Sequence, residues 1–79
     1  MSLGKKIQKR RKELGISAAD LADSLGISHS SMSNIENDRL KGGPLPEIVV
    51  KIAEDFNDNS ILLHYLEENP VYRAIIPLT

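Results

Sequence analysis

The feature that most restricts how this chain can fold is a pair of short helix-like segments separated by a tight turn. Each segment begins at a serine suited to cap a helix, Ser17 or Ser28, and the turn is Gly26-Ile27-Ser28. Glycine permits a backbone conformation, or a close helix approach, that a Cβ would hinder. The pattern predicts two helices at a steep angle, the second at about 28–36 with a free outer face. The apolar wedge between them consists of Leu21, Leu25, Ile27, Met32 and Ile35.

The rest of the chain predicts three more helices. Residues 3–14 have apolar side chains at helical spacing, and Gly15 is a suitable stop. A fourth helix begins at Pro46, because proline suits the first helical turn, and a fifth covers about 60–68 before Pro70. We therefore expect an all-α protein built as a compact five-helix bundle.

The last ten residues differ in character from the bundle. We divide the chain into a domain at 1–69 and an extended C-terminal tail at 70–79, where Val71, Tyr72 and Ile75 favour a strand. A single strand cannot stand alone, so we expect the tail and the fifth helix to mediate homodimerisation. The expected dimer contacts are Ile61, Tyr65, Tyr72 and Ile75.

Several function classes have no support in the sequence. The chain of 79 residues has no cysteine and only two histidines, far apart, so we expect no metal site and no cofactor. It contains no Gly-rich phosphate loop, no G-x-S-x-G elbow and no H-E-x-x-H motif, so we expect no enzyme activity. No apolar run approaches the ~20 residues of a membrane span. The absence of cysteine suits the reducing cytoplasm, where we expect the protein to reside.

The charges are distributed unevenly although the net charge is only −1. Through Lys41 the chain has eight Lys and Arg against five Asp and Glu, whereas the remainder has two against six. The N-terminal half can therefore face an anionic partner while the acidic half faces away.

The outer face of the helix at 28–36 is short and polar, a character that permits close approach to the edges of DNA bases. It has no Lys or Arg, and neither has any other part of residues 17–38. Attraction to phosphate must then come from the first helix and from the loop after residue 38. The expected basic contacts are Lys5, Lys9, Arg10, Arg39 and Lys41. Helix starts, with their free N–H groups, add Ser17, Ser28 and Ser31 to the expected phosphate contacts.

The run from Ile7 to Phe56 resembles the Cro/C1-type helix-turn-helix family of phage repressors and Xre-like bacterial regulators. The matching stretches, in order, are RRKELGIS, LADSLGIS, SMSNIEND and IVVKIAEDF. The resemblance implies a lambda-repressor-like bundle that binds a two-fold symmetric operator in double-stranded DNA as a homodimer. It implies base contacts by His29, Ser30, Ser33 and Asn34, and an ion pair between Arg11 and Glu36 that joins the first helix to the recognition helix.

Three positions depart from the family pattern. Ala18 stands where members commonly have a phosphate-contacting glutamine, and Leu45 stands where a capping residue is usual. Asn37-Asp38 replaces the glycine that often ends the recognition helix. Asparagine tolerates the left-handed cap conformation, so this last change is mild.

The sequence thus favours a sequence-specific DNA-binding transcriptional regulator, which we expect to be a repressor. The alternative is a protein-interaction module on the same fold, such as an antitoxin or an antirepressor-controlled subunit, with weak DNA affinity of its own. The uncharged recognition helix, the net charge of −1 and the apolar tail motivate that alternative, with a partner bound through the C-terminal helix and tail.

Overall fold

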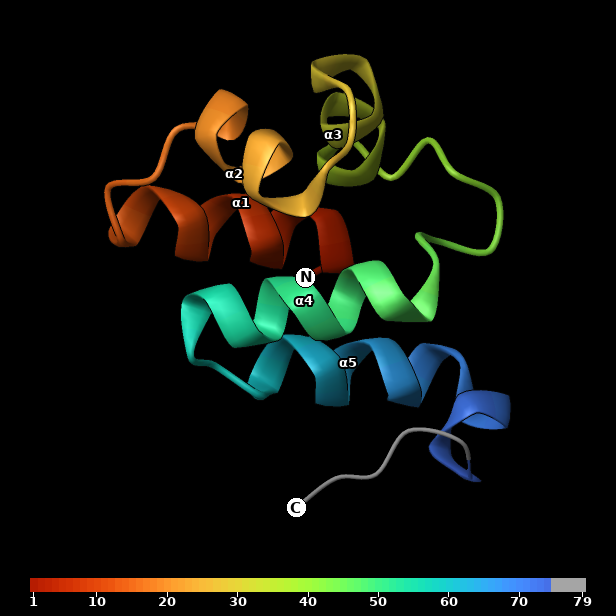
Figure 1. Cartoon of the computed structure of the whole chain (residues 1–79). Helices are drawn as coiled ribbons and strands as arrows, with labels where there is room; N and C mark the ends of the chain where they lie inside the picture. The colour runs from red at the N-terminus through yellow and green to blue at the C-terminus, as the bar shows by residue number, and fades with distance from the viewer. Residues whose placement is uncertain (75–79) are drawn as a thin grey trace.

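Five α-helices follow one another in the computed structural model, which describes residues 1–74 (Figure 1). They are α1 Leu3–Glu13, α2 Ala18–Leu25, α3 His29–Glu36, α4 Pro46–Phe56 and α5 Ser60–Glu68, followed by a short 3₁₀ helix at Pro70–Ala74. No strand occurs within the described part of the chain. The prediction of an all-α five-helix bundle is confirmed.

Local capping explains where the first three helices begin. Ser2, Ser17 and Ser28 each have extended backbone, and each side chain accepts a hydrogen bond from the backbone N–H three residues later. Helix α4 instead starts at Pro46, and its N-cap residue Leu45 makes no side-chain cap bond. Because these signals lie in neighbouring residues, the observed bounds follow the predicted ones closely.

The helices enclose a single apolar core to which each of the five contributes. Helix α1 contacts α3 on one side and α5 on another, α2 contacts α3 and α4, and α4 and α5 run side by side (Figure 1). The arrangement keeps α2 and α3 together at one end of the molecule. The fully buried side chains include Ile7, Leu21, Met32, Val49, Ile52, Ile61, Tyr65 and Leu66.

The tail corrects one prediction. Val71 and Tyr72 lie in the 3₁₀ helix and not in a strand, because the backbone hydrogen bonding there is local. The Tyr72 N–H donates to the carbonyl three residues earlier, that of Asn69, at 3.1 Å. The Tyr72 ring stacks on Tyr65 with a centroid separation of 5.8 Å. The stack holds the 3₁₀ helix at Pro70–Ala74 against α5. Ile75 lies outside the described residues.

Candidate nucleic-acid interface

Helix α3 is exposed along one side and buried along the other. His29, Ser30 and Ser33 are exposed and Asn34 is half-buried, whereas Met32 and Ile35 belong to the core. The buried side packs against α2 and α1. The outer side therefore presents short polar groups and one imidazole, and these let a large partner approach the helix closely.

The turn before α3 sets the direction of that helix. Gly26 has φ of +69°, in the left-handed region, and the Ile27 N–H donates to the Ala22 carbonyl at 3.0 Å. Ala22 is fully buried, so its small side chain lets the surrounding helices lie close together. The turn predicted from Gly26-Ile27-Ser28 thus ends α2 and starts α3 within three residues.

A buried ion pair ties the end of α3 to α1. Arg11 donates through Nε to Glu36 Oε2 at 2.7 Å and through Nη2 to Oε1 at 3.1 Å. Its Nη1 donates to the Ile16 carbonyl at 2.9 Å, and the Arg11 and Glu36 side chains are only 9% and 5% exposed. A bidentate arginine–carboxylate pair fixes the relative orientation of its two side chains, so it fixes the position of α3 on α1. Removing one partner would leave a buried charge without compensation.

A close backbone contact at Gly4 joins the same two helices, and the sequence reasoning missed it. Gly4 is buried in the first turn of α1, and a Cβ there would lie 2.5 Å from the Glu36 carbonyl oxygen and 2.6 Å from that of Ile35. Only glycine allows this approach. The available signal was a glycine inside a helical pattern, where it weakens the helix and so suggests a packing reason.

Some of the polar groups on the outer face of α3 already have partners. His29 Nε2 lies 3.4 Å from Asp23 Oδ1 on α2, and the Asn37 amide donates to the Ser33 carbonyl at 2.8 Å and to its hydroxyl at 3.3 Å. Within residues 1–74, no such bond involves the side chain of Ser30 or Asn34. These two side chains are therefore the most available for a partner.

The serines expected at phosphates also serve as caps. The Ser17 hydroxyl accepts from the Asp20 N–H at 3.0 Å, and Ser28 accepts from the Ser31 N–H at 3.0 Å while donating to its hydroxyl. These bonds orient the starts of α2 and α3 with their N–H groups outward, which favours an anion at that end.

The basic residues form two separate groups. Arg39 and Lys41 are exposed in the loop directly after α3, and Lys5 is exposed at the end of α1 that meets the end of α3. Lys9 and Arg10 instead line a hollow on the α5 side of α1, beside Ser60 and His64. The structure thus separates Lys9 and Arg10 from α3, although the sequence grouped all five cations as phosphate contacts.

Acidic side chains hold Arg10 on that side. Its Nε lies 3.2 Å from Asp58 Oδ2, and its Nη1 lies 3.5 Å from Glu13 Oε1. Two hydrogen bonds from Ser60, and then the neighbouring cations Arg10 and Lys6, hold the pKa of Asp58 below its ordinary value. Arg10 therefore already has an anionic partner within the chain.

Comparison with known families decides what this arrangement is. The chain matches the helix-turn-helix domain family over residues 4–67, which is most of its length. It belongs to that family. Neither the comparison with curated proteins nor that with solved structures gives a match. The family assignment agrees with the resemblance seen in the sequence, and it makes the chain a DNA-binding helix-turn-helix domain in which α2 and α3 form the motif.

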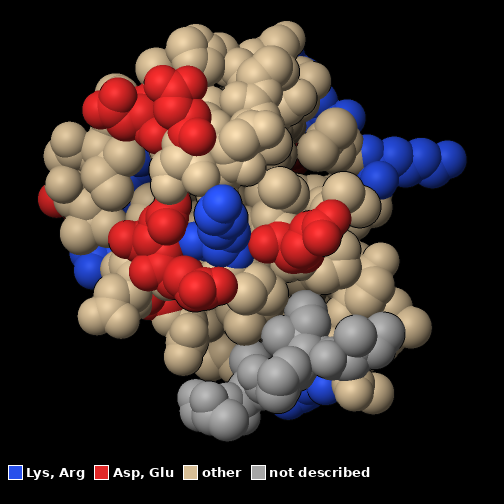
Figure 2. All heavy atoms as spheres, viewed as in Figure 1, with Lys and Arg blue, Asp and Glu red and all other residues tan. Residues whose placement is uncertain are grey.

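The face of the domain over α4 is unsuited to a polyanion. The view onto α4 shows several groups of acidic side chains around a basic one (Figure 2). The exposed acidic residues of α4 are Glu47, Glu54 and Asp55, with Lys51 among them. The concentration of negative charge on this face disfavours the approach of a polyanion.

The expected dimer contacts need correction. Ile61 and Tyr65 are 0% and 1% exposed within the single chain, so neither offers a surface to a second copy. They face inward because α5 buries one side against α4 and α1. Tyr72 is half-buried by its stacking on Tyr65, and Ile75 lies outside the described residues. The exposed apolar groups of this region are Leu63 and Val71.

None of the helices in residues 1–74 has the length and apolar character needed to span a bilayer. Over the same residues, no three His, Asp or Glu side chains gather as ligands for a metal ion.

Proposed function

We propose that this helix-turn-helix domain is a sequence-specific transcriptional regulator that inserts α3 into the major groove of double-stranded DNA. The observation that carries the proposal is the exposed polar side of α3, held on α1 by the Arg11–Glu36 pair and the Gly4 contact. A major groove about 12 Å wide admits a helix, and short side chains let it approach the base edges. We propose cytoplasmic DNA as the target.

Each group on α3 has a role suited to its chemistry. The Asn34 amide can pair with adenine through two hydrogen bonds, and Ser30, Ser33 and His29 can donate or accept at several base edges. Arg39 and Lys41 would contact phosphates beside the groove, together with the N–H groups at the starts of α2 and α3. Of the two regulatory senses we propose repression, because occupying a site needs no further contact, whereas activation needs a surface that recruits another protein.

Selection of bound sequences from random duplex DNA tests the proposal directly. We expect recovery of a defined motif, and Asn34→Ala should weaken binding to it by about 1–3 kcal/mol while relaxing the preference at one base pair. Asn59→Ala is the matched control, because Asn59 is exposed at the start of α5 and makes no side-chain cap bond. Failure to bind any duplex at low salt would rule the proposal out.

One observation favours the second candidate, a protein-interaction module with little DNA affinity. Helix α2 carries two exposed carboxylates, Asp20 and Asp23, and Asp23 lies 3.4 Å from His29 of α3. Residues 17–38 contain no Lys or Arg to offset them. Under this candidate, the C-terminal helix and tail would capture a protein partner while every duplex bound weakly and without sequence preference. The same selection experiment therefore separates the two candidates.

A further inference from the structure

Asp38 occupies a backbone position that ordinarily favours glycine. Its φ is +55°, its N–H donates to the Ile35 carbonyl at 3.2 Å, and the Arg39 N–H donates to the Asn34 carbonyl at 2.9 Å. This pair of bonds is the left-handed turn that closes many helices, usually with glycine at its centre. A side chain there is strained unless it makes a compensating contact.

The Asp38 carboxylate makes that contact at the start of α1. Ser2 Oγ donates to Oδ2 at 2.6 Å, and the Gly4 N–H donates to Oδ1 at 3.0 Å. The Gly4 N–H is one of the groups that a helix start leaves without an internal partner, and a carboxylate is the favoured acceptor there. Asp38 therefore closes α3 with its backbone and caps α1 with its side chain.

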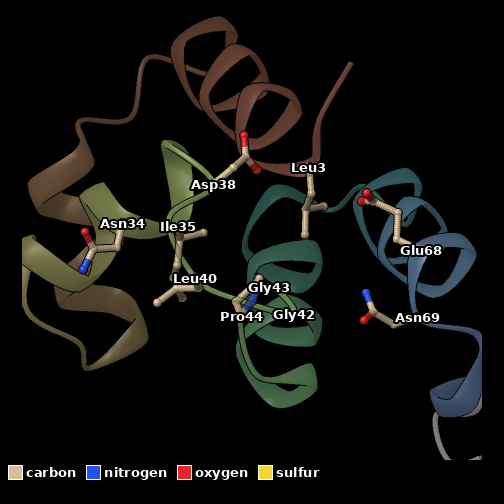
Figure 3. Close-up of a pocket in the computed structure, with 10 residues that line it drawn as sticks. All are labelled: Leu3, Asn34, Ile35, Asp38, Leu40, Gly42, Gly43, Pro44, Glu68 and Asn69. Carbon is tan, nitrogen blue, oxygen red and sulfur yellow. The ribbon is translucent and has the colours of Figure 1, made fainter.

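The surrounding geometry makes this double role specific. The approach of α1 to the Glu36 and Ile35 carbonyls is possible only because residue 4 is glycine, and it brings the Asp38 carboxylate within reach of the helix start. Asp38 and Asn34 line the same hollow, in which the Asp38 carboxylate points toward α1 while Asn34 points away from it (Figure 3). The side chain proposed to read a base is thus one helical turn from the residue that anchors its helix.

We propose that Asp38 is a positioning residue for DNA recognition. Its carboxylate links the end of α3 to the start of α1 through the bonds from Ser2 and Gly4, and we call this link the tie. The tie sets the depth and angle at which α3 presents Asn34. It also sets the direction of the following loop, which carries Arg39 and Lys41. The inference rests on the proposed function and adds to it a determinant of specificity that touches no base. A glycine at this place, as in the family pattern, would form the same turn but would have no carboxylate to bond to the start of α1.

A charge effect opposes the positioning effect, and this opposition makes the proposal testable. Asp38 adds a negative charge near the expected phosphate contacts. If charge were its only influence, removing it should strengthen binding to every duplex equally. Loss of the tie should instead weaken binding only to the duplex that carries the selected motif. A scrambled duplex offers no base contacts that depend on the placement of α3.

The experiment compares Asp38→Gly with Asp38→Asn on two probes. The probes are the duplex selected by the unmodified protein and a scrambled duplex of equal composition. Asp38→Gly keeps the turn and removes the carboxylate, and we expect about a tenfold loss on the selected duplex with unchanged or tighter binding to the scrambled one. Asp38→Asn retains an acceptor for Gly4 and should recover most of the loss.

Equal or tighter binding of both duplexes by Asp38→Gly would overturn the proposal, and so would an equal loss on both. Hydrogen exchange of the free variants provides a readout that needs no DNA. The Gly4 N–H should exchange much faster in Asp38→Gly, while the amides around Arg11 and Glu36 keep their protection; an unchanged rate at Gly4 would show that no tie exists. If the unmodified protein bound no duplex, the proposed function would fail and the positioning role with it, whereas the exchange result would still decide the tie.

Discussion

At Gly4, two effects of an added methyl group oppose each other. Alanine is the better helix former by up to about 1 kcal/mol, so helix propensity by itself favours a stabilising effect of Gly4→Ala on α1. In the folded chain the new Cβ would lie 2.5 Å and 2.6 Å from two carbonyl oxygens of α3, and backbone atoms cannot rotate away as a side chain can. The packing effect should therefore outweigh the propensity effect.

We predict that Gly4→Ala lowers the free energy of unfolding by about 1–3 kcal/mol, as over-packed sites generally do. Urea unfolding, monitored by circular dichroism, measures this change in the free energy of unfolding. Lys5→Ala, one residue further on the exposed side, is the control and should change stability by less than about 0.5 kcal/mol. A stabilised Gly4→Ala would mean that α1 and α3 are not in close backbone contact.

At the scale of one element, Asp58 controls the start of α5. Its Oδ1 accepts from the Ser60 N–H at 2.9 Å and from the Ser60 hydroxyl at 2.6 Å. These bonds, ahead of the nearby cations Arg10 and Lys6, lower the pKa of Asp58 in the folded state. The resulting stabilisation is complete above the unfolded-state pKa and is lost as the pH falls through the folded-state pKa.

Asp58→Asn keeps an acceptor oxygen for Ser60 but loses the negative charge. It should therefore be less stable than the unmodified protein near neutral pH by about 0.3–1 kcal/mol, the usual contribution of a negative charge at a helix N-terminus. The difference should shrink as the pH falls from neutral to about pH 2, because the carboxylate is protonated first in the unfolded state and then increasingly in the folded state. Urea unfolding at the two pH values measures this, with Glu54→Gln on the exposed side of α4 as the control. A difference that grew on acidification would contradict the assignment.

The loop after α3 and the α5 side of α1 should contribute differently to DNA binding. Lys41→Ala should reduce the slope of log affinity against log salt by about one, because one phosphate contact releases about one counterion. Lys9→Ala should leave the slope nearly unchanged, since Lys9 lines the hollow beside α5. Fluorescence anisotropy across a salt series measures both slopes. The reverse result would place the DNA along α1 and not along the loop.

At the scale of the whole molecule, we predict that two chains bind one operator. A symmetric pair would place its α3 helices one helical turn apart, about 34 Å, so the selected motif should be an inverted repeat. Sedimentation of the complex should give two chains per duplex. A duplex with one half scrambled should bind much more weakly. A motif without two-fold symmetry, bound by one chain, would contradict the prediction.

Much of the fold could be predicted because its signals are local. Ser17, Gly26 and Ser28 mark the helix-turn-helix by capping and turn chemistry that neighbouring residues satisfy. Spacing of apolar residues identified the buried faces of the helices in the same way. Ile61 and Tyr65 show the limit: the pattern marked them as apolar, but it could not say whether α4, α1 or a second chain would cover them.

The segment from Ser17 to Glu36 was therefore determined by sequence alone, as a helix, a turn and a second helix with a polar outer side. The family resemblance implied the Arg11–Glu36 pair that holds the second helix, but only the tertiary structure showed the contacts at Gly4 and Asp38. Arg11, Gly4 and Asp38 act across 25 or more positions of the chain, through contacts that exist only once α1 lies against α3. The tertiary structure likewise separated Lys9 and Arg10 from Arg39 and Lys41. Which side of α1 faces α5 depends on how the helices pack, and the periodicity of the sequence does not determine it.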